Sequence, residues 1–380
     1  MRKNQFWVLL MAFLLTTFLF LLATKQGLLL TYDSRAYLQL SQNSSFQSLI
    51  NAVWMPLYAL LLSFGNIFGD GFGEKNILIF AKIFHLICLL LIILQTFFII
   101  KKHIKITILQ YFVLFMVGFS VANLQNAVFL WSEPFFIVLL LQIFILINKE
   151  NNNTKIFFLL IILSNLLCFQ RLAGIIFVGL FSVILLFKDS KYIKNSLKAI
   201  FYMLTSISGI IFWFFLKKYY QNTPQLAENL ILGDFLANVS SCLLVMLEWF
   251  LPSFLLDFLP IFVKISIMIL LILIMIFLAI KNRNKLIISL LILVFGYISA
   301  ICLLALNIPS ETDRYISVVQ IFFFIGLGAS LDNTIFWEKN IIIFKRILLI
   351  LMLLVLSYNT IRTTKNAVFW SKTAKIDIEK

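Results

Sequence analysis

The sequence predicts an all-α membrane protein, a polytopic bundle of about eleven transmembrane helices, and three observations lead to this prediction. Hydrophobic residues make up 62% of the 380 residues and charged residues only 12%. The mean hydropathy of +1.04 exceeds what a soluble domain can bury. Lysines and arginines lie in short clusters between apolar runs, which is typical of the cytoplasmic loops of membrane proteins.

The polar residues also exclude several classes of function. The net charge of +15 does not indicate a nucleic-acid partner, because the basic residues lie in the short clusters between spans. The four cysteines stand singly, and the two histidines belong to no metal motif. The sequence therefore identifies no cofactor and no metal ligands, although it leaves a divalent cation open.

The first apolar run, at about 5–24, follows Arg2 and Lys3. It is long for a signal peptide, so we expect an uncleaved span with the N-terminus in the cytoplasm. Residues 25–54 are polar and mixed, as in a long exterior loop. The apolar stretch 55–69 is short for a span and is expected to form an interfacial helix in this loop.

The remaining apolar runs extend to residue 357 and close near basic clusters. Residues 155–187 are too long for one crossing, and Arg171 divides them. The other expected spans are 77–100, 106–122, 131–147, 155–169, 172–187, 199–216, 254–280, 286–306, 315–331 and 341–357. Residues 1–357 thus form one transmembrane domain, and 358–380 form a polar tail.

The sidedness of these spans brings four charged residues to one face. Loops assigned to the cytoplasm hold more than half of the 31 lysines and arginines, which supports the assignment. On this topology Asp33, Glu133, Arg171 and Arg314 all emerge on the exterior face. Charge next to the hydrocarbon is costly unless it is paired or lines a wet cavity, so this gathering indicates a functional site.

Two of the four have an ordinary structural alternative at a helix start. Asp33 could cap a short helix beginning at Ser34. Glu133 stands between Ser132 and Pro134, an order that suits a helix N-terminus, where an acid meets the positive end of the dipole. For Glu133 the structural and functional interpretations are equally well supported.

The two arginines also have structural alternatives. Arg171 could extend to the headgroups from between two short spans. Arg314 is flanked by Glu311 and Asp313 and could form a local ion pair. Because these carboxylates outnumber the single arginine, a site is the better explanation of Arg314.

Several short motifs, which follow one another along the chain from Tyr32 to Tyr315, resemble those of GT-C membrane glycosyltransferases. The resemblance covers roughly residues 1–330 and is closest to the branch that holds protein O-mannosyltransferases and the lipid A aminoarabinose transferases. The resemblance rests on the order of the motifs along the chain and on their expected position on one side of the membrane. The first loop departs from the family pattern in having Asp33 alone where paired acids are usual. The motifs are Tyr32-Asp33-Ser34-Arg35-Ala36-Tyr37, Met55-Pro56-Leu57-Tyr58, Ser132-Glu133-Pro134, Gln170-Arg171-Leu172 and Asp313-Arg314-Tyr315.

The resemblance implies transfer of a sugar from a polyprenyl-phosphate donor to an exterior acceptor, with inversion at the anomeric carbon. Asp33 is then the candidate base, since a carboxylate can accept the acceptor's proton at neutral pH. Arg314 is the first candidate and Arg171 the second for stabilising the leaving phosphate. Glu133 would orient hydroxyl groups or help to hold a cation.

Other expectations follow from the same resemblance and from composition. Tyr37 and Tyr315 are candidates for contacting the substrate, although interfacial tyrosines are common without such a role. The loop 217–252, which contains Glu228 and Asp234, could cover the site. The abundance of Phe, Ile, Asn and Lys indicates an AT-rich genome, which is typical of many bacteria. A bacterial protein of this kind would lie in the plasma membrane. The acceptor (lipid, polymer or protein), the sugar and the oligomeric state are not specified.

Two alternative functions remain open. A polysaccharide polymerase or ligase also uses lipid-linked sugars, but such proteins usually have a large late exterior loop, and here 307–314 is short. A secondary transporter usually has two related halves with charges at mid-depth. This sequence has no internal repeat, and its charges lie at the ends of the spans.

Overall fold

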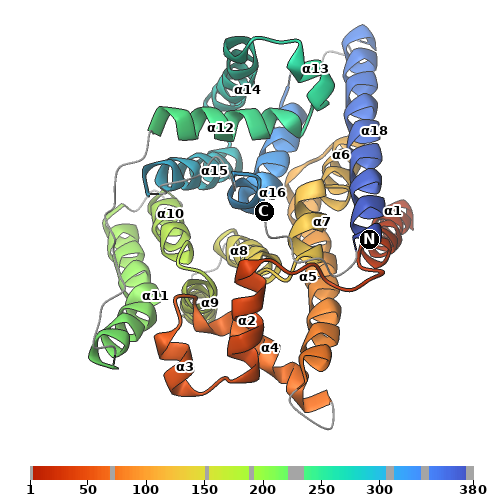
Figure 1. The fold of residues 1–380 in the computed structure, drawn as a ribbon. Coiled ribbons are helices and arrows are strands. Elements are labelled where there is room, and N and C mark those ends of the chain that lie inside the picture. Colours follow the sequence, from red (N-terminus) through yellow and green to blue (C-terminus); the bar gives the residue numbers. More distant parts are fainter. Residues whose placement is uncertain are drawn as a thin grey trace. The chain divides into compact units, whose positions relative to one another are not determined.

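The computed structural model describes residues 3–68, 73–149, 154–187, 192–220, 235–304, 312–334 and 342–373. Regular structure in these ranges is helical, apart from a parallel bridge between Leu29 and Phe129. Figure 1 shows the helices, which are α1 (Lys3–Ala23), α2 (Tyr32–Gln42), α3 (Phe46–Asn51), α4 (Pro56–Ser63), η1 (Phe64–Phe68), α5 (Glu74–His103), α6 (Thr107–Gly118), α7 (Val121–Val128), α8 (Glu133–Ile147), α9 (Thr154–Gln170), α10 (Gly174–Leu186), α11 (Tyr192–Tyr220), α12 (Phe235–Glu248), α13 (Ser253–Asp257), α14 (Ile261–Lys281), α15 (Lys285–Leu304), α16 (Thr312–Asp332) and α18 (Ile342–Lys372).

The predicted class, a polytopic helical membrane protein, is confirmed. Within the described ranges, eight helical stretches are long and apolar enough to cross a membrane. They are α1, α5, the stretch Thr107–Val128 formed by α6 and α7, α11, α14, α15, α16 and α18. Glu228, Asp234 and Glu311, on which some sequence expectations rest, lie outside the described residues.

Three of the helices that were expected as spans are shorter than an ordinary span. Helices α8, α9 and α10 contain 15, 17 and 13 residues. At about 1.5 Å per residue they are about 20–26 Å long, against about 30 Å for a hydrocarbon core. The predicted division at Arg171 is confirmed, because α9 ends at Gln170 and α10 begins at Gly174.

The elements of the long first loop are more helical than expected. Helix α4 begins at Pro56, which suits the first position of a helix because its missing N–H needs no partner there. It continues as the 3₁₀ helix η1, so Pro56–Phe68 forms a short apolar helical element in the stretch expected to be an interfacial helix. Helices α2 and α3 occupy the part of the loop that precedes it.

Two predicted boundaries late in the chain differ from the structure. Pro260 stands as N-cap of α14 and separates it from α13, where one span over 254–280 was expected. Helix α18 continues to Lys372 through most of the segment predicted as a polar tail. No glycine or proline interrupts residues 342–372, so the local sequence offers no signal that would end the helix.

The chain folds as two units, and the first consists of residues Met1–Leu19, Thr96–Leu124 and Leu230–Asn366. Its central helix is α16, which packs on α15, α6, α12 and α14 and is buried over most of its length. The carboxylate of Asp332, at the end of α16, accepts hydrogen bonds from the backbone N–H groups of Lys105 (3.0 Å) and Ile106 (2.8 Å). This contact fastens the residues that immediately precede α6 to the end of α16.

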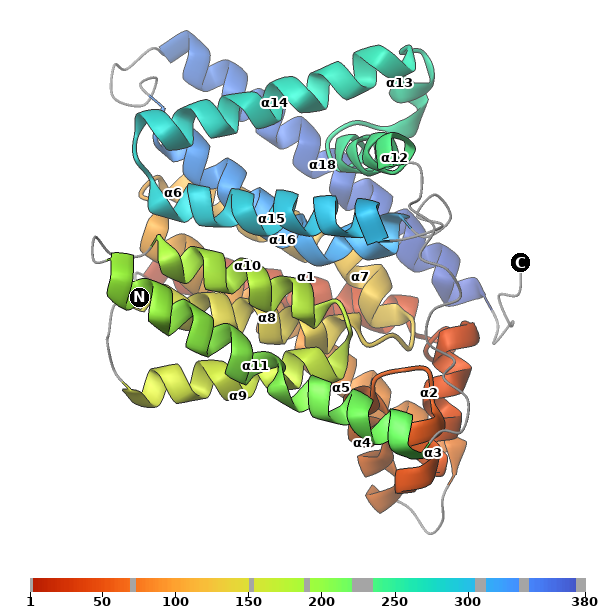
Figure 2. The same ribbon diagram turned by 90° about the vertical axis from the view of Figure 1, so that its left-hand side faces the viewer.

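The second unit consists of Phe20–Gln95, Gln125–Asn229 and Ala367–Lys380. Helix α9 packs against α8, α10, α11 and α4, while α2 packs on α4 and α3 on α11. Figure 2 shows that α2, α3 and α4 gather at one end of α9 and α11. The end of unit 2 that holds Glu133 and Arg171 therefore adjoins the small helices of the first loop.

Close packing of α9 against α11 depends on Gly209. A Cβ atom at this position would lie 2.7 Å from Oδ1 of Asn165 and 2.9 Å from the ring of Phe169. The Asn165 side chain is held there, because its amide donates to the carbonyl of Thr205 at 3.0 Å. A larger residue at 209 must therefore separate the two helices.

We expect Gly209→Val to destabilise the protein by about 1–3 kcal/mol through overpacking. The matched control is Gly179→Val in α10, where an added Cβ would meet nothing within 4 Å. Thermal unfolding of both variants in detergent checks the prediction. Equal midpoints for the two variants would contradict the proposed close contact.

Candidate functional site

An ion pair between Glu133 and Arg171 lies at the centre of the candidate site in unit 2. Glu133 is the first residue of α8, and its side chain is fully buried. The Arg171 side chain retains 17% exposure and lies over the ring of Phe136, with its central carbon 6.0 Å from the ring centroid. The sequence placed both residues on one face, and the structure brings them into contact.

Hydrogen bonds to backbone carbonyls hold the two helix ends that carry this pair. The side-chain amide of Gln170 donates to the carbonyl of Ser132 at 3.0 Å and so joins the end of α9 to the start of α8. The turn after Arg171 is tight, since the N–H of Gly174 donates to the Arg171 carbonyl at 2.8 Å. A Cβ at Gly174 would lie 2.6 Å from the Leu167 carbonyl oxygen, so this turn requires glycine.

Tyr37 of α2 adds a phenol to the pair. It is buried, lies close to the Ser132 hydroxyl and interacts electrostatically with Arg171, Glu133 and Asp33. Burial raises the pKa of Tyr37, while the positive charge of Arg171 acts in the opposite direction. The phenol therefore keeps its proton at neutral pH and is a hydrogen-bond donor.

Asp33 lies in the first turn of α2 and is half-buried. The N-cap of α2 is Thr31, whose hydroxyl accepts from the N–H of Ser34 at 3.4 Å. The alternative that Asp33 itself caps a helix starting at Ser34 is thus wrong, because the helix begins at Tyr32 and Thr31, two residues before Asp33, is its N-cap. Asp33 lies in the first turn, within electrostatic reach of the Tyr37 phenol.

The loop before α8 fixes the position of α2. The N–H of Leu29 donates to the backbone carbonyl of Val128, and the N–H of Leu130 donates to the backbone carbonyl of Leu29, each at 3.0 Å. Further along, the indole N–H of Trp131 donates to the Thr31 hydroxyl at 3.0 Å. Asp33, Tyr37, Glu133 and Arg171 are therefore held by short connections within one unit.

A buried pair that the sequence analysis missed lies behind Tyr37. The Tyr58 hydroxyl donates to Nε2 of His85 at 2.6 Å, and Nδ1 of His85 donates to the carbonyl of Ala127 at 2.8 Å. A carbonyl only accepts, so the proton of the neutral imidazole sits on Nδ1. The ring of Tyr58 meets the ring of Tyr37 edge-on at 4.9 Å. A polar residue within the apolar run 77–100 was the available signal for His85.

Arg314 and Tyr315 belong to unit 1, in the first turn of α16. That they share a site with Asp33 stays a prediction. The backbone carbonyl of Arg314 accepts from the Ser317 hydroxyl at 2.6 Å.

Unit 1 also holds a charged group that the sequence analysis assigned to the tail. Arg362 donates from Nη1 to the carbonyl of Glu248 at 2.9 Å and pairs through Nη2 with its carboxylate at 3.2 Å. Asp313 is within electrostatic reach of this guanidinium. The absence of any helix breaker before Arg362 was the signal that could have found it.

The candidate site offers poor ligands for a divalent cation. In the described portions of the chain, no three His, Cys, Asp or Glu side chains cluster in a way that could hold a metal ion. A hard cation needs several oxygen ligands, and Arg171 already binds the Glu133 carboxylate. The residues present do not fit such a cation, so we derive no step through one.

Two solved structures share the fold of this chain. The Archaeoglobus fulgidus oligosaccharyltransferase superposes with a TM-score of 0.60 and 12% identity, covering 97% of this chain and 56% of that one. ArnT from Cupriavidus metallidurans gives a TM-score of 0.57 and 13% identity, covering 88% and 61%. This chain thus spans less than two thirds of the length of either. No family model matches the sequence, and no protein of curated function matches it.

The environment of Glu133 predicts an asymmetric response to substitution. Arg171→Met leaves a buried carboxylate without its counterion, which typically costs about 3–5 kcal/mol. We expect the double variant Arg171→Met/Glu133→Gln to recover most of this loss, because the amide needs no counterion. Thermal unfolding of the parent, the single variant and the double variant checks the prediction. A double variant that is no more stable than Arg171→Met would contradict it.

Proposed function

We propose that this protein is a membrane glycosyltransferase that moves a sugar from a polyprenyl-phosphate donor to an exterior acceptor, with inversion. The fold that it shares with the oligosaccharyltransferase and with ArnT, which is the fold that the resemblance implied, supports this proposal, as do its apolar helices able to cross a membrane. The observation that carries the proposal is the cluster of Asp33, Tyr37, Glu133 and Arg171 at one end of short apolar helices.

The environments of the two carboxylates assign them different roles. A base must reach the proton that it accepts, and half-buried Asp33 meets this requirement. Glu133 is fully buried, and its charge is already compensated by Arg171. We therefore assign the base to Asp33, and to Glu133 the orientation of the Arg171 guanidinium.

The reaction is a single displacement. The acceptor hydroxyl gives its proton to the Asp33 carboxylate while its oxygen attacks the anomeric carbon of the sugar. The bond from that carbon to the phosphate oxygen breaks, and the electron pair leaves with the polyprenyl phosphate. The base lies opposite the leaving group, as in inverting glycosidases, and this geometry inverts the anomeric centre.

Arginine suits the stabilisation of the leaving phosphate. A guanidinium carries five N–H donors and stays charged, so Arg171 can bind a phosphate oxygen while it also binds Glu133. Arg314 remains the first candidate for this role and acts from the start of α16. Tyr37 supplies a neutral donor to a sugar or phosphate oxygen, and Tyr315 is the corresponding candidate beside Arg314.

The proposed orientation of the protein in the membrane follows from the distribution of its basic residues. We assign the N-terminus and the basic loops to the cytoplasm of a plasma membrane, and the Asp33 end of unit 2 to the exterior. The acceptor is then an exterior lipid, polymer or protein.

Asp33→Asn should lower turnover by a factor of about 10²–10⁴, because it removes the base and keeps the shape of the side chain. The measurement is sugar release from a panel of polyprenyl-phosphate sugars by purified protein, with membrane extract as acceptor. Glu74→Gln is the matched control, since Glu74 is also an acid in a first helical turn of unit 2 and is exposed. Full activity of Asp33→Asn would refute the assigned base, and a parent that turns over none of the panel would contradict the donor class.

Arg314→Ala should lower kcat by a factor of about 10²–10³ by removing charge stabilisation from the leaving group, and Arg314→Lys should restore part of the loss. The same release assay, run at saturating donor, measures the effect. Arg346→Ala, an exposed arginine of α18 in unit 1, is the control. If Arg314→Ala turns over like this control, the leaving-group role falls to Arg171.

A further inference from the structure

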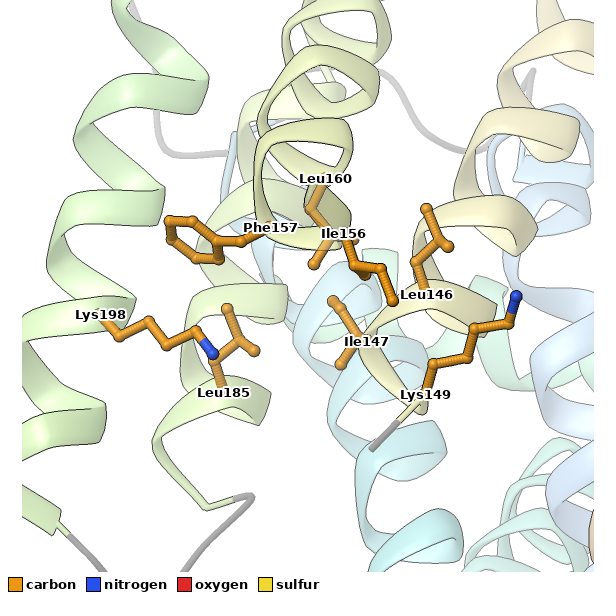
Figure 3. A pocket seen from close by; sticks show the side chains of 8 residues that line it. All are labelled: Leu146, Ile147, Lys149, Ile156, Phe157, Leu160, Leu185 and Lys198. Carbon is orange, nitrogen blue, oxygen red and sulfur yellow. The ribbon is translucent and has the colours of Figure 1, made fainter. Parts of the chain in front are cut away.

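Away from the candidate site, chemistry-bearing side chains gather in two further places. The first is a hollow between α8, α9, α10 and α11, at the end of α8 that lies away from Glu133, and Figure 3 shows the apolar side chains and lysines that line it. Only about 10 Å³ of this hollow is open to a water-sized molecule, so it has room for about one water and for no larger ligand. The second place is a pair of thiols in unit 1, formed by Cys242 and Cys302.

The two sulfur atoms are in contact although their residues are far apart in the sequence. Sγ of Cys242 lies 3.7 Å from Sγ of Cys302, and 60 positions separate the two residues along the chain. Both thiols are free in this structure, and both residues are buried. Because the sulfur atoms already touch, rotation about the Cα–Cβ bonds and a small movement of the helices bring them within bonding distance.

The thiols lie in the packed interface between α12 and α15. On α12, Asn238, Cys242 and Met246 follow one another at intervals of four residues and are all buried, so they form one face of the helix. Asn238 fastens this face to α15, because its side-chain amide donates to the backbone carbonyl of Cys302 at 3.2 Å. This contact, one helical turn from Cys242, holds the two sulfur atoms opposite each other.

Both cysteines belong to the part of the chain that is expected on the exterior face. Cys302 lies two residues before the end of α15, and α15 begins at the basic cluster 281–285, which the sequence assigns to the cytoplasm. Helix α12 lies within the loop 217–252, which is expected to be exterior. Figure 2 shows α12, seen nearly end-on, next to the last turns of α15. Outside a plasma membrane, thiols meet an oxidising environment in which disulfides form and persist.

We propose that Cys242 and Cys302 form a disulfide that fastens α12 to α15 at the exterior end of unit 1. The oxidant is an exterior thiol–disulfide exchange protein or small disulfide. The thiolate of one cysteine attacks the oxidant's disulfide, which gives a mixed disulfide and releases one oxidant thiol. The thiolate of the other cysteine attacks the mixed disulfide, the internal sulfur–sulfur bond forms, and the second oxidant thiol leaves.

The two electrons that the cysteines lose reduce the oxidant's disulfide, and their two protons end on the released oxidant thiols. Because buried thiols are unreactive, the exchange takes place while the chain folds, before α12 closes over α15. The inference goes beyond the proposed transferase function. It rests on the proposed orientation in the membrane and not on any transferase activity.

The test counts free thiols in the full-length protein, which is taken from membranes into acid so that thiols do not exchange. The denatured protein is labelled with N-ethylmaleimide before or after reduction, and its intact mass is measured. The chain has four cysteines, and the proposal leaves Cys88 and Cys168 free. We therefore expect two labels without reduction and four after it. Four labels without reduction would overturn the proposal, and because no substrate is used, that result would not bear on the transferase.

Two variants identify the members of the pair. Cys242→Ala should take up three labels both without and after reduction, because Cys302 loses its partner. Cys168→Ala, the matched control for another buried cysteine, should take up one label without reduction and three after it. A single label on unreduced Cys242→Ala, or three labels on unreduced Cys168→Ala, would show a different pairing and would overturn the assignment.

Discussion

The buried charge of Glu133 is the constraint on which one end of unit 2 depends. A carboxylate with no exposed surface requires a cation in contact, and Arg171 is that cation. The requirement fixes how the start of α8 meets the end of α9. A second contact joins the same two helix ends, because the side-chain amide of Gln170 donates a hydrogen bond to the Ser132 carbonyl. Tyr37 and Asp33 then take their places on α2 against this pair. The reactive groups of the proposed transferase are thus arranged by an electrostatic need that exists without any substrate.

The break between α9 and α10 was predictable from sequence, whereas the partner of Arg171 was not. A charged residue in the middle of an apolar run too long for one span has to lie at a turn, so local sequence is sufficient to place Arg171. The choice of Glu133 over another exterior acid depends on the packing of α8 against α9, which is a tertiary property. The Tyr58–His85 pair was missed for the same reason, because its members come from α4 and α5.

Late in the chain the expected spans follow from hydrophobic length alone, and here their boundaries differ most from those of the helices. A span of about 20 residues suffices to cross a bilayer, but nothing requires the helix to end there. Helix α18 continues to Lys372, and Arg362 on this extension meets Glu248. A residue that reads as part of a polar tail is therefore part of the folded unit. The absence of helix breakers was more informative here than the loss of hydrophobicity.

The short helices α8, α9 and α10 have a consequence for the surrounding lipid. A hydrophobic length below that of the bilayer is accommodated by local thinning of the membrane, at a cost of a fraction of a kcal/mol per Å. The polar cluster at the Glu133 end then sits below the average headgroup level of the leaflet on its side of the membrane, and the surrounding headgroups sink towards it. Membranes of short-chain lipids reduce this deformation, so bilayer thickness becomes a physical variable that favours one membrane over another for this protein.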